Sequence, residues 1–245
     1  MTSHGRYANA LETYKHAIDD VSKRVMQDRS LHLQNLSEVY IQALSGNMPM
    51  GYVDMVEKAV GERSTNNGMK LIYDAADLTV HDSKLNSALQ NNRQVLSGGG
   101  VADGSRRALD GMKYSAKRSN ALLANFNQKL AQDRRFHTQE LEALYSATPG
   151  NSACKSVLSK MIQSRHMNNK SRTAHDANMW SETEHSVSAA LGGGMDAREV
   201  LAHGVHGTSP APRMSGGGCG SDSLPLHNPE AAELWGELLN GGGMY

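Results

Sequence analysis

Histidine is the chemically versatile residue that gathers most visibly in this chain, since imidazole binds metal ions and transfers protons. Six of the eleven histidines lie between residues 166 and 227. Two of them, His203 and His206, are three residues apart, and with Cys219 they could seed a zinc site, because zinc takes imidazole nitrogen and thiolate sulfur. However, the region has neither an HExxH motif nor a CxxC pair. We therefore predict no metal site, and His203, His206 and Cys219 remain its only weak candidates.

Motifs for covalent or phosphate chemistry are equally missing from the sequence. There is no GxSxG element to present a nucleophilic serine, and nothing around Cys154 indicates an activated thiol. Four Gly triplets, at 98–100, 192–194, 216–218 and 241–243, lack the Lys-Ser/Thr of a phosphate-binding loop. The sequence therefore predicts no catalytic residues, no cofactor and no small-molecule substrate, and we expect a protein that is not an enzyme.

Basic residues concentrate in two stretches, 103–135 and 155–172, whereas the chain after Arg213 carries acidic residues alone. Helix faces of this kind contact nucleic-acid phosphates or a protein partner. The candidate contact residues are Arg106, Arg107, Lys113, Lys117, Lys155, Lys160, Arg165, Lys170 and Arg172. No nucleic-acid recognition motif accompanies them, so both kinds of partner stay open.

Composition limits the classes of protein that fit. Of 245 residues, 38% are apolar and 5% aromatic, and the mean hydropathy is −0.54, which is low for a thick globular core. The 25 basic and 25 acidic residues balance, which excludes a polycation that coats nucleic acid. No apolar run could span a membrane, and the first residues do not resemble a signal peptide. The two separated cysteines, Cys154 and Cys219, indicate free thiols in a reducing compartment. We expect a virion or the cytoplasm of the producing cell as the location.

Long amphipathic helices must position whatever site the chain has. The clearest is predicted over residues 7–44, where apolar residues alternate spacings of four and three before the register slips at Arg29. The seam consists of Tyr7, Leu11, Tyr14, Ile18, Val21, Val25, Leu33, Leu36, Tyr40 and Leu44. Such a helix is about 55 Å long at about 1.5 Å per residue, so it needs partner helices of similar length.

Further helices are expected along the chain, and no period-two pattern indicates a strand. After a break at 45–51, a shorter helix is predicted to stop near the glycine of 66–68, and another, carrying Leu71, to stop at 97–100. A long helix capped by Asp103 or Ser105 then extends to 148–151. Polar residues interrupt these seams: Asp82, Asn92, Ser119, Asp133 and His137. The fold class is therefore all-α, an elongated helical bundle or antiparallel coiled-coil hairpins with a Gly/Ser/Pro-rich tail and a short terminal helix.

Four regions follow from this pattern. Residues 1–150 form a long-helix bundle with a hairpin joint at 97–104, and residues 151–203 form a polar, His-rich helical region that includes a short helix from 195. Residues 204–227 read as a flexible linker. Residues 228–245 contain a docking helix and tail.

The terminal helix has an apolar face too small for a core of its own. Its docking residues are Leu234, Trp235, Leu238 and Leu239, with Trp235 as the anchor. The acidic residues nearby would suit the basic stretch 155–172 of the same chain, but a groove on another chain would serve equally.

Three functions fit these observations. The first is a structural or assembly protein that oligomerises with itself and with other structural proteins, most concretely a bacteriophage internal, ejection or tail-associated virion component. The second is a helical protein that binds nucleic acid through its basic faces at 106–135 and 155–172. The third is a secreted translocator or effector-like helical protein.

Overall fold

The computed structural model describes residues 2–97, 102–150 and 152–205. In this part of the chain every regular element is a helix: α1 (Ser3–Ser45), α2 (Met50–Ser97), α3 (Ala102–Ala147), α4 (Ala153–Leu191) and α5 (Met195–Val205). The protein is therefore all-α, as the sequence predicts. The predicted terminal helix within 228–245, and nearly all of the predicted linker, lie outside the described residues.

The ends of the helices lie where side chains or glycine satisfy free backbone groups. Thr2 caps α1 and Ser152 caps α4, each side-chain oxygen accepting a hydrogen bond from the backbone N–H three residues on, at 3.3 and 3.2 Å. Asn47, at φ 49°, lies in the turn between α1 and α2. Gly192 ends α4 at φ 84°, a left-handed conformation that glycine adopts without steric cost.

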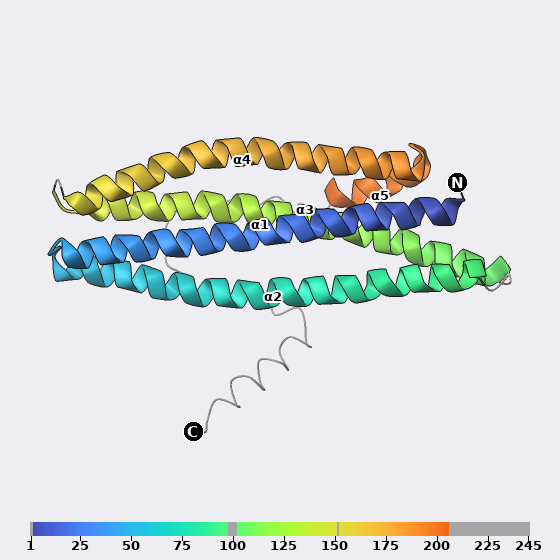
Figure 1. Cartoon of the computed structure of the whole chain (residues 1–245), viewed down its shortest axis with the longest axis horizontal. Coiled ribbons are helices and arrows are strands. Elements are labelled where there is room, and N and C mark those ends of the chain that lie inside the picture. Colours follow the sequence, from blue (N-terminus) through green and yellow to red (C-terminus); the bar gives the residue numbers. More distant parts are fainter. Residues whose placement is uncertain (1, 98–101, 151, 206–245) are drawn as a thin grey trace, which may run out of the picture.

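The four long helices lie side by side and alternate in direction along the chain, forming one elongated bundle (Figure 1). α1 and α3 run the same way and make the most extensive contact in the fold. α2 packs on one side of this central pair and α4 on the other, while α5 folds back under the end of α4 and packs on α3. The helices are 43, 48, 46 and 39 residues long, which confirms that the first needs partners of similar length.

Two separate apolar clusters hold the bundle together, one in each half. The larger cluster forms around Tyr7–Val25 of α1 and includes Phe126, Leu130 and the buried residues of α5. The smaller cluster lies where α1 turns into α2 and α3 turns into α4, and it includes Leu36, Tyr52 and Cys154. The predicted seam from Tyr7 to Val25 is therefore core, as expected. Between the clusters, the interior is polar.

The predicted break of the second helix at residues 66–68 is wrong, because α2 continues through this segment. A glycine inside a helix costs about 1 kcal/mol relative to alanine. Here tertiary contacts offset that cost: the side-chain amide of Asn67 donates to the backbone carbonyl of Arg29 at 3.3 Å, and the ammonium of Lys70 lies 2.6 Å from the carboxylate of Asp133. Packing against neighbouring helices thus outweighs the local preference for a stop.

Smaller expectations also need correction. α3 begins at Ala102, so Ser105 lies inside its first turns and does not cap it; its hydroxyl instead bonds the ring of His4 at 3.0 Å. Asp103 likewise lies within the helix. Leu44 and Leu71 were expected on buried seams but are 48% and 47% exposed.

The polar stretch that follows residue 152 forms one long helix, α4, despite its weak apolar pattern. Its buried residues are widely spaced, and they include Leu158, Arg165 and Val187. Contacts with α1 and α3, more than any stripe of its own, keep this helix in the bundle. None of the described helices is long and apolar enough to cross a membrane.

Candidate functional site: a buried charged layer and an adjoining groove

A layer of charged side chains crosses the middle of the bundle between the two apolar clusters. All four long helices contribute to it, because each places polar residues at the same height along the bundle. The most buried members are Asp28, Arg29, His32, Arg63, Asp74, Asp133, Arg134, His137 and Arg165, each at most 6% exposed. Charges buried this far from water are costly unless each is paired. Each buried charge in the layer therefore needs an oppositely charged partner.

On the side of α2, the charges alternate around Arg29. Its guanidinium contacts the carboxylates of Asp74 and Asp133, at 2.6 Å each. Lys70 contacts the second oxygen of Asp133, and Lys129 the second oxygen of Asp74, also at 2.6 Å. Each carboxylate is thus bound by two cations from different helices, which fixes the register of α1, α2 and α3.

On the side of α4, Asp28 is the central acceptor. One of its oxygens accepts a hydrogen bond from Arg165 and the other from Nδ1 of His137, both at 2.8 Å. A second carboxylate, that of Asp176, is bound by Arg24 of α1 and by Arg134 of α3. These contacts tie α4 to the α1–α3 pair.

Two imidazoles join the halves of the layer. The rings of His32 and His137 are stacked, with centroids 4.0 Å apart and planes 15° from parallel. Nε2 of His32 is 2.6 Å from Glu140, whose other oxygen accepts a hydrogen bond from Arg63 at 3.2 Å. Both imidazole side chains are fully buried.

Burial and pairing shift the titration of this layer. Burial lowers the pKa of His32 to about 4, although its hydrogen bond with Glu140 opposes the shift. Burial likewise lowers the pKa of His137, against the effect of Asp28. For the carboxyl of Asp28, burial alone would raise the pKa, but the hydrogen bond from His137 and the charge of Arg165 bring it below its ordinary value. Both rings are thus held neutral beside ionised carboxylates.

The pair of Asp28 and His137 has the hydrogen-bonded geometry of a general base. Among the described residues, however, neither imidazole lines the groove described next, and both rings are sealed from solvent. Substrate would have no access to them without opening the bundle. The arrangement is instead suited to fixing helix register at a cost in stability.

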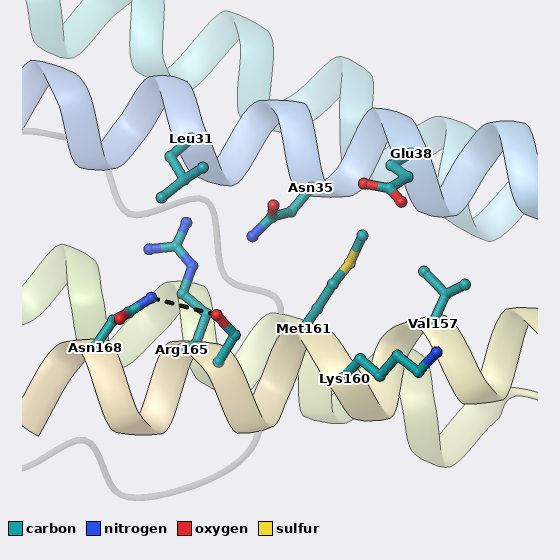
Figure 2. Close-up of a pocket in the computed structure, with 9 residues that line it drawn as sticks. Leu31, Asn35, Glu38, Val157, Lys160, Met161, Arg165 and Asn168 are labelled. Atoms are coloured by element: carbon teal, nitrogen blue, oxygen red, sulfur yellow. Dashed lines mark hydrogen bonds between the residues drawn. The ribbon is translucent and has the colours of Figure 1, made fainter.

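An open groove adjoins the layer on the surface between α1 and α4 (Figure 2). Its volume is about 460 Å³. The walls are formed by Leu31, Asn35, Glu38, Val157, Lys160, Met161, Ser164, Arg165 and Asn168. Arg165 connects the groove to the layer, because its guanidinium extends from α4 toward α1 while also bonding Asp28. The lining combines apolar side chains with cationic, amide and carboxylate groups.

The predicted basic contact residues occupy several places in the fold. Arg106 and Arg107 are exposed at the start of α3, whereas Lys155 and Lys160 lie at the start of α4, at the opposite end of the bundle. Lys113 is 3.7 Å from Asp196, and Lys117 pairs with Glu199, so both face α5. Lys170 and Arg172 are exposed on α4, and Arg165 is buried.

The other predicted site residues lie outside the part of the chain that the structure describes. These are the side chain of His203 and the whole of His206, Cys219, Leu234, Trp235, Leu238 and Leu239. Among the described residues, no group of three or more His, Cys, Asp or Glu is arranged to hold a metal ion.

Sequence reasoning noticed part of the charged layer and missed the rest. Asp133 and His137 stood out because they interrupt an apolar seam, and Arg29 marked the slip of register in the first helix. Asp74 gave no such signal, because the apolar pattern of its helix is weak. Arg165 was singled out only as a contact for nucleic acid or a protein partner. Polar residues that lie at the same position along the bundle axis in each predicted helix were the pattern that could have indicated the layer.

No protein-family model matches the chain, and neither a curated protein nor a solved structure resembles it significantly.

Proposed function

We propose that this protein is a non-enzymatic structural protein that assembles through its long helices, with further copies of itself and with other structural proteins. A component of a virion, such as a bacteriophage internal, ejection or tail-associated protein, is the concrete form we favour. The support for that form is the combination of long polar helices and Gly-triplet joints in a chain without motifs for catalysis.

The observation that carries the proposal is the apolar surface near the α1–α2 turn. Four large apolar side chains within fifteen residues of sequence are exposed there: Ile41 by 60%, Leu44 by 48%, Met50 by 70% and Met55 by 46%. Single exposed apolar residues are ordinary, but grouped ones mark interaction sites. The interior of the same bundle contains a charged layer between its two apolar clusters, so a neighbouring chain that covers these exposed apolar side chains would add burial that the single chain lacks.

The buried charged layer supports the same proposal. A buried ionic network specifies register better than it adds stability. In an elongated bundle that contacts neighbouring chains, a fixed register of the helices keeps the outer surface the same in every copy. Its lost stability is regained when neighbouring chains cover the exposed apolar side chains.

Sedimentation of the full chain tests the proposal. We expect a mass above the 26.5 kDa of one chain, rising with concentration. Replacing Ile41 and Leu44 together by Asp places charge in the apolar surface, so the mass falls toward that of one chain. The matched control replaces Gln27 and Gln34, two exposed polar residues of the same helix, by Asp and leaves the mass unchanged. A single species of one-chain mass at every concentration contradicts the proposal.

Binding of nucleic acid is less well supported. The basic residues near 106 and those near 155 lie at opposite ends of the bundle, and Lys113, Lys117 and Arg165 are engaged by carboxylates. We therefore do not extend the proposal to nucleic acid.

A further inference from the structure

The groove between α1 and α4 contains hydrogen-bond donors that nothing else in the described structure satisfies. Arg165 is 3% exposed, and although one of its terminal nitrogens bonds Asp28, its Nε and Nη2 have no partner among the described residues. An unsatisfied buried donor costs about 1–3 kcal/mol, and more when the group is charged. Figure 2 shows this guanidinium close to Leu31. Because its Nε and Nη2 are themselves buried, a carboxylate in the groove would reach them only if the side chain turned outward.

The stretch of α4 beside the groove is basic, and two of its cations, Lys160 and Arg165, line the groove itself. From residue 155 to residue 172, α4 has Lys155, Lys160, Arg165, Lys170 and Arg172 and no acidic residue. One carboxylate, Glu38 of α1, lines the opposite wall. The apolar side chains extend from both sides, Leu31 from α1 and Val157 and Met161 from α4. The groove is thus shaped for a ligand with both apolar and negatively charged groups, and its 460 Å³ lies in the range of about 300–1,000 Å³ found for ligand pockets.

We propose that the C-terminal segment of this same chain, residues 228–245, docks in the groove between α1 and α4. Its apolar residues Leu234, Trp235 and Leu238 cover the apolar side chains of the groove, and its glutamates face Lys160 and Arg165. The segment contains Glu230, Glu233 and Glu237, and the chain has no basic residue after Arg213. Charge and apolarity therefore match on both sides. The proposal is independent of the assembly proposed above.

The chain between α5 and the segment is long enough to reach. Residues 206–227 number 22, and an extended chain covers about 3.3 Å per residue, or about 70 Å in all. Along α4, the 23 residues from Leu191 back to Asn168 at the edge of the groove cover about 35 Å. α5 itself already points back along α4. Docking within one chain is therefore geometrically possible without strain.

A second hollow on the other side of α4 is a poorer match. It is smaller, about 330 Å³, and is lined by Glu142, Tyr145 and Ile162 among others, without any Lys or Arg. Glu142, its one charged lining residue, would repel an acidic segment, although Lys155 lies over the ring of Tyr145 at 5.1 Å. The groove beside Arg165 is the better site on both counts.

Tryptophan fluorescence of the full chain tests the proposal, because Trp180 and Trp235 are its only tryptophans. In the Trp180→Phe variant, Trp235 is the sole reporter. We expect blue-shifted emission and acrylamide quenching several-fold weaker than in urea. Lys160→Glu, in the same background, places a negative charge at the groove and restores solvent-like emission and quenching. Lys84→Glu is the matched control, because Lys84 is exposed on α2, across the bundle, and pairs with no described residue. We expect this control to change neither the emission nor the quenching of Trp235.

Three outcomes overturn the proposal. The first is emission from Trp235 that is solvent-like in the native chain. The second is an equal effect of Lys160→Glu and Lys84→Glu. The third is protection that disappears on dilution, which assigns the groove to a second copy instead. If Trp180→Phe perturbs the fold, the difference between the spectra of the unmodified chain and of Trp235→Phe reports the same quantity. Mass is measured separately, so loss of docking and loss of assembly are distinguished.

Discussion

Asp28 is the carboxylate on which the α4 side of the layer depends. It accepts hydrogen bonds from Arg165 and His137, and Arg172 approaches to 3.9 Å. Its side chain is 2% exposed, so water can replace none of these partners. In a site this dry, the free energy of the network depends less on the attraction itself than on leaving no charge alone.

Asp28→Asn tests that dependence at the scale of one residue. The amide has nearly the same shape but no charge, so Arg165 is left as an uncompensated buried cation. We expect the free energy of unfolding to fall by about 3 kcal/mol, in the range for breaking a buried ion pair. The control is Glu62→Gln in the exposed pair with Lys58, 3.7 Å apart, where the loss is no more than about 0.5 kcal/mol. Urea unfolding measures both; equal losses would show that burial does not govern the layer.

At the scale of the helix, the sequence predicted which segments are helical better than it predicted where each helix ends. The spacing of Tyr7, Leu11, Tyr14 and Ile18 identified α1, because a long stripe of large apolar residues at this spacing is buried by forming a helix that packs against other helices. The stop near Gly68 was wrong, because local propensity is worth about 1 kcal/mol and contacts across helices exceed it. The partners of Asp133 were out of reach altogether: they lie 63 and 104 residues away along the chain, and only the packed register brings them together.

Gly68 inside α2 and Gly192 at the end of α4 are predicted to respond to alanine with opposite signs. Gly68 lies inside α2, and a Cβ there meets nothing within 4 Å, so Gly68→Ala should raise the free energy of unfolding by roughly 0.5–1 kcal/mol. At Gly192, φ is 84° and a Cβ would lie 2.8 Å from the Arg6 guanidinium. Gly192→Ala should therefore lower stability by about 1 kcal/mol or more. Thermal unfolding measures both variants, and a shift of the same sign in each would contradict the assignment of the two backbone conformations.

On the scale of the whole molecule, the charged layer divides the bundle into two apolar halves. Each half has its own cluster of buried residues, and the stacked pair of His32 and His137 lies where they meet. Protonating both rings would put two positive charges 4.0 Å apart, beside the fixed charges of Arg63 and Arg165. The cohesion of the two halves therefore depends on these rings staying neutral.

Acid should weaken the bundle before its carboxylates titrate. The pKa of His32 is about 4 in the fold, below the 6.5 of a free histidine, so the unfolded chain binds the proton more tightly. Above about pH 6.5, His32 therefore does not lower the free energy of unfolding, and this free energy falls as the pH drops from there toward 4. Between about pH 7 and pH 5 this single ring accounts for roughly 2 kcal/mol, at 1.36 kcal/mol per pKa unit. The lowered pKa of His137 acts in the same direction.

Urea unfolding at about pH 7 and pH 5 measures this loss. His32→Gln still offers an N–H to Glu140 but cannot be protonated, so the variant should lose roughly 2 kcal/mol less than the unmodified chain across this interval. His16→Gln, an exposed histidine on the same helix, should leave the pH dependence as it is. The carboxyls of Asp28, Asp133 and Glu140 also have lowered pKa values, but their contribution disappears only below about pH 4. An equal loss in the unmodified chain and in His32→Gln would place the acid-sensitive groups outside the stacked pair.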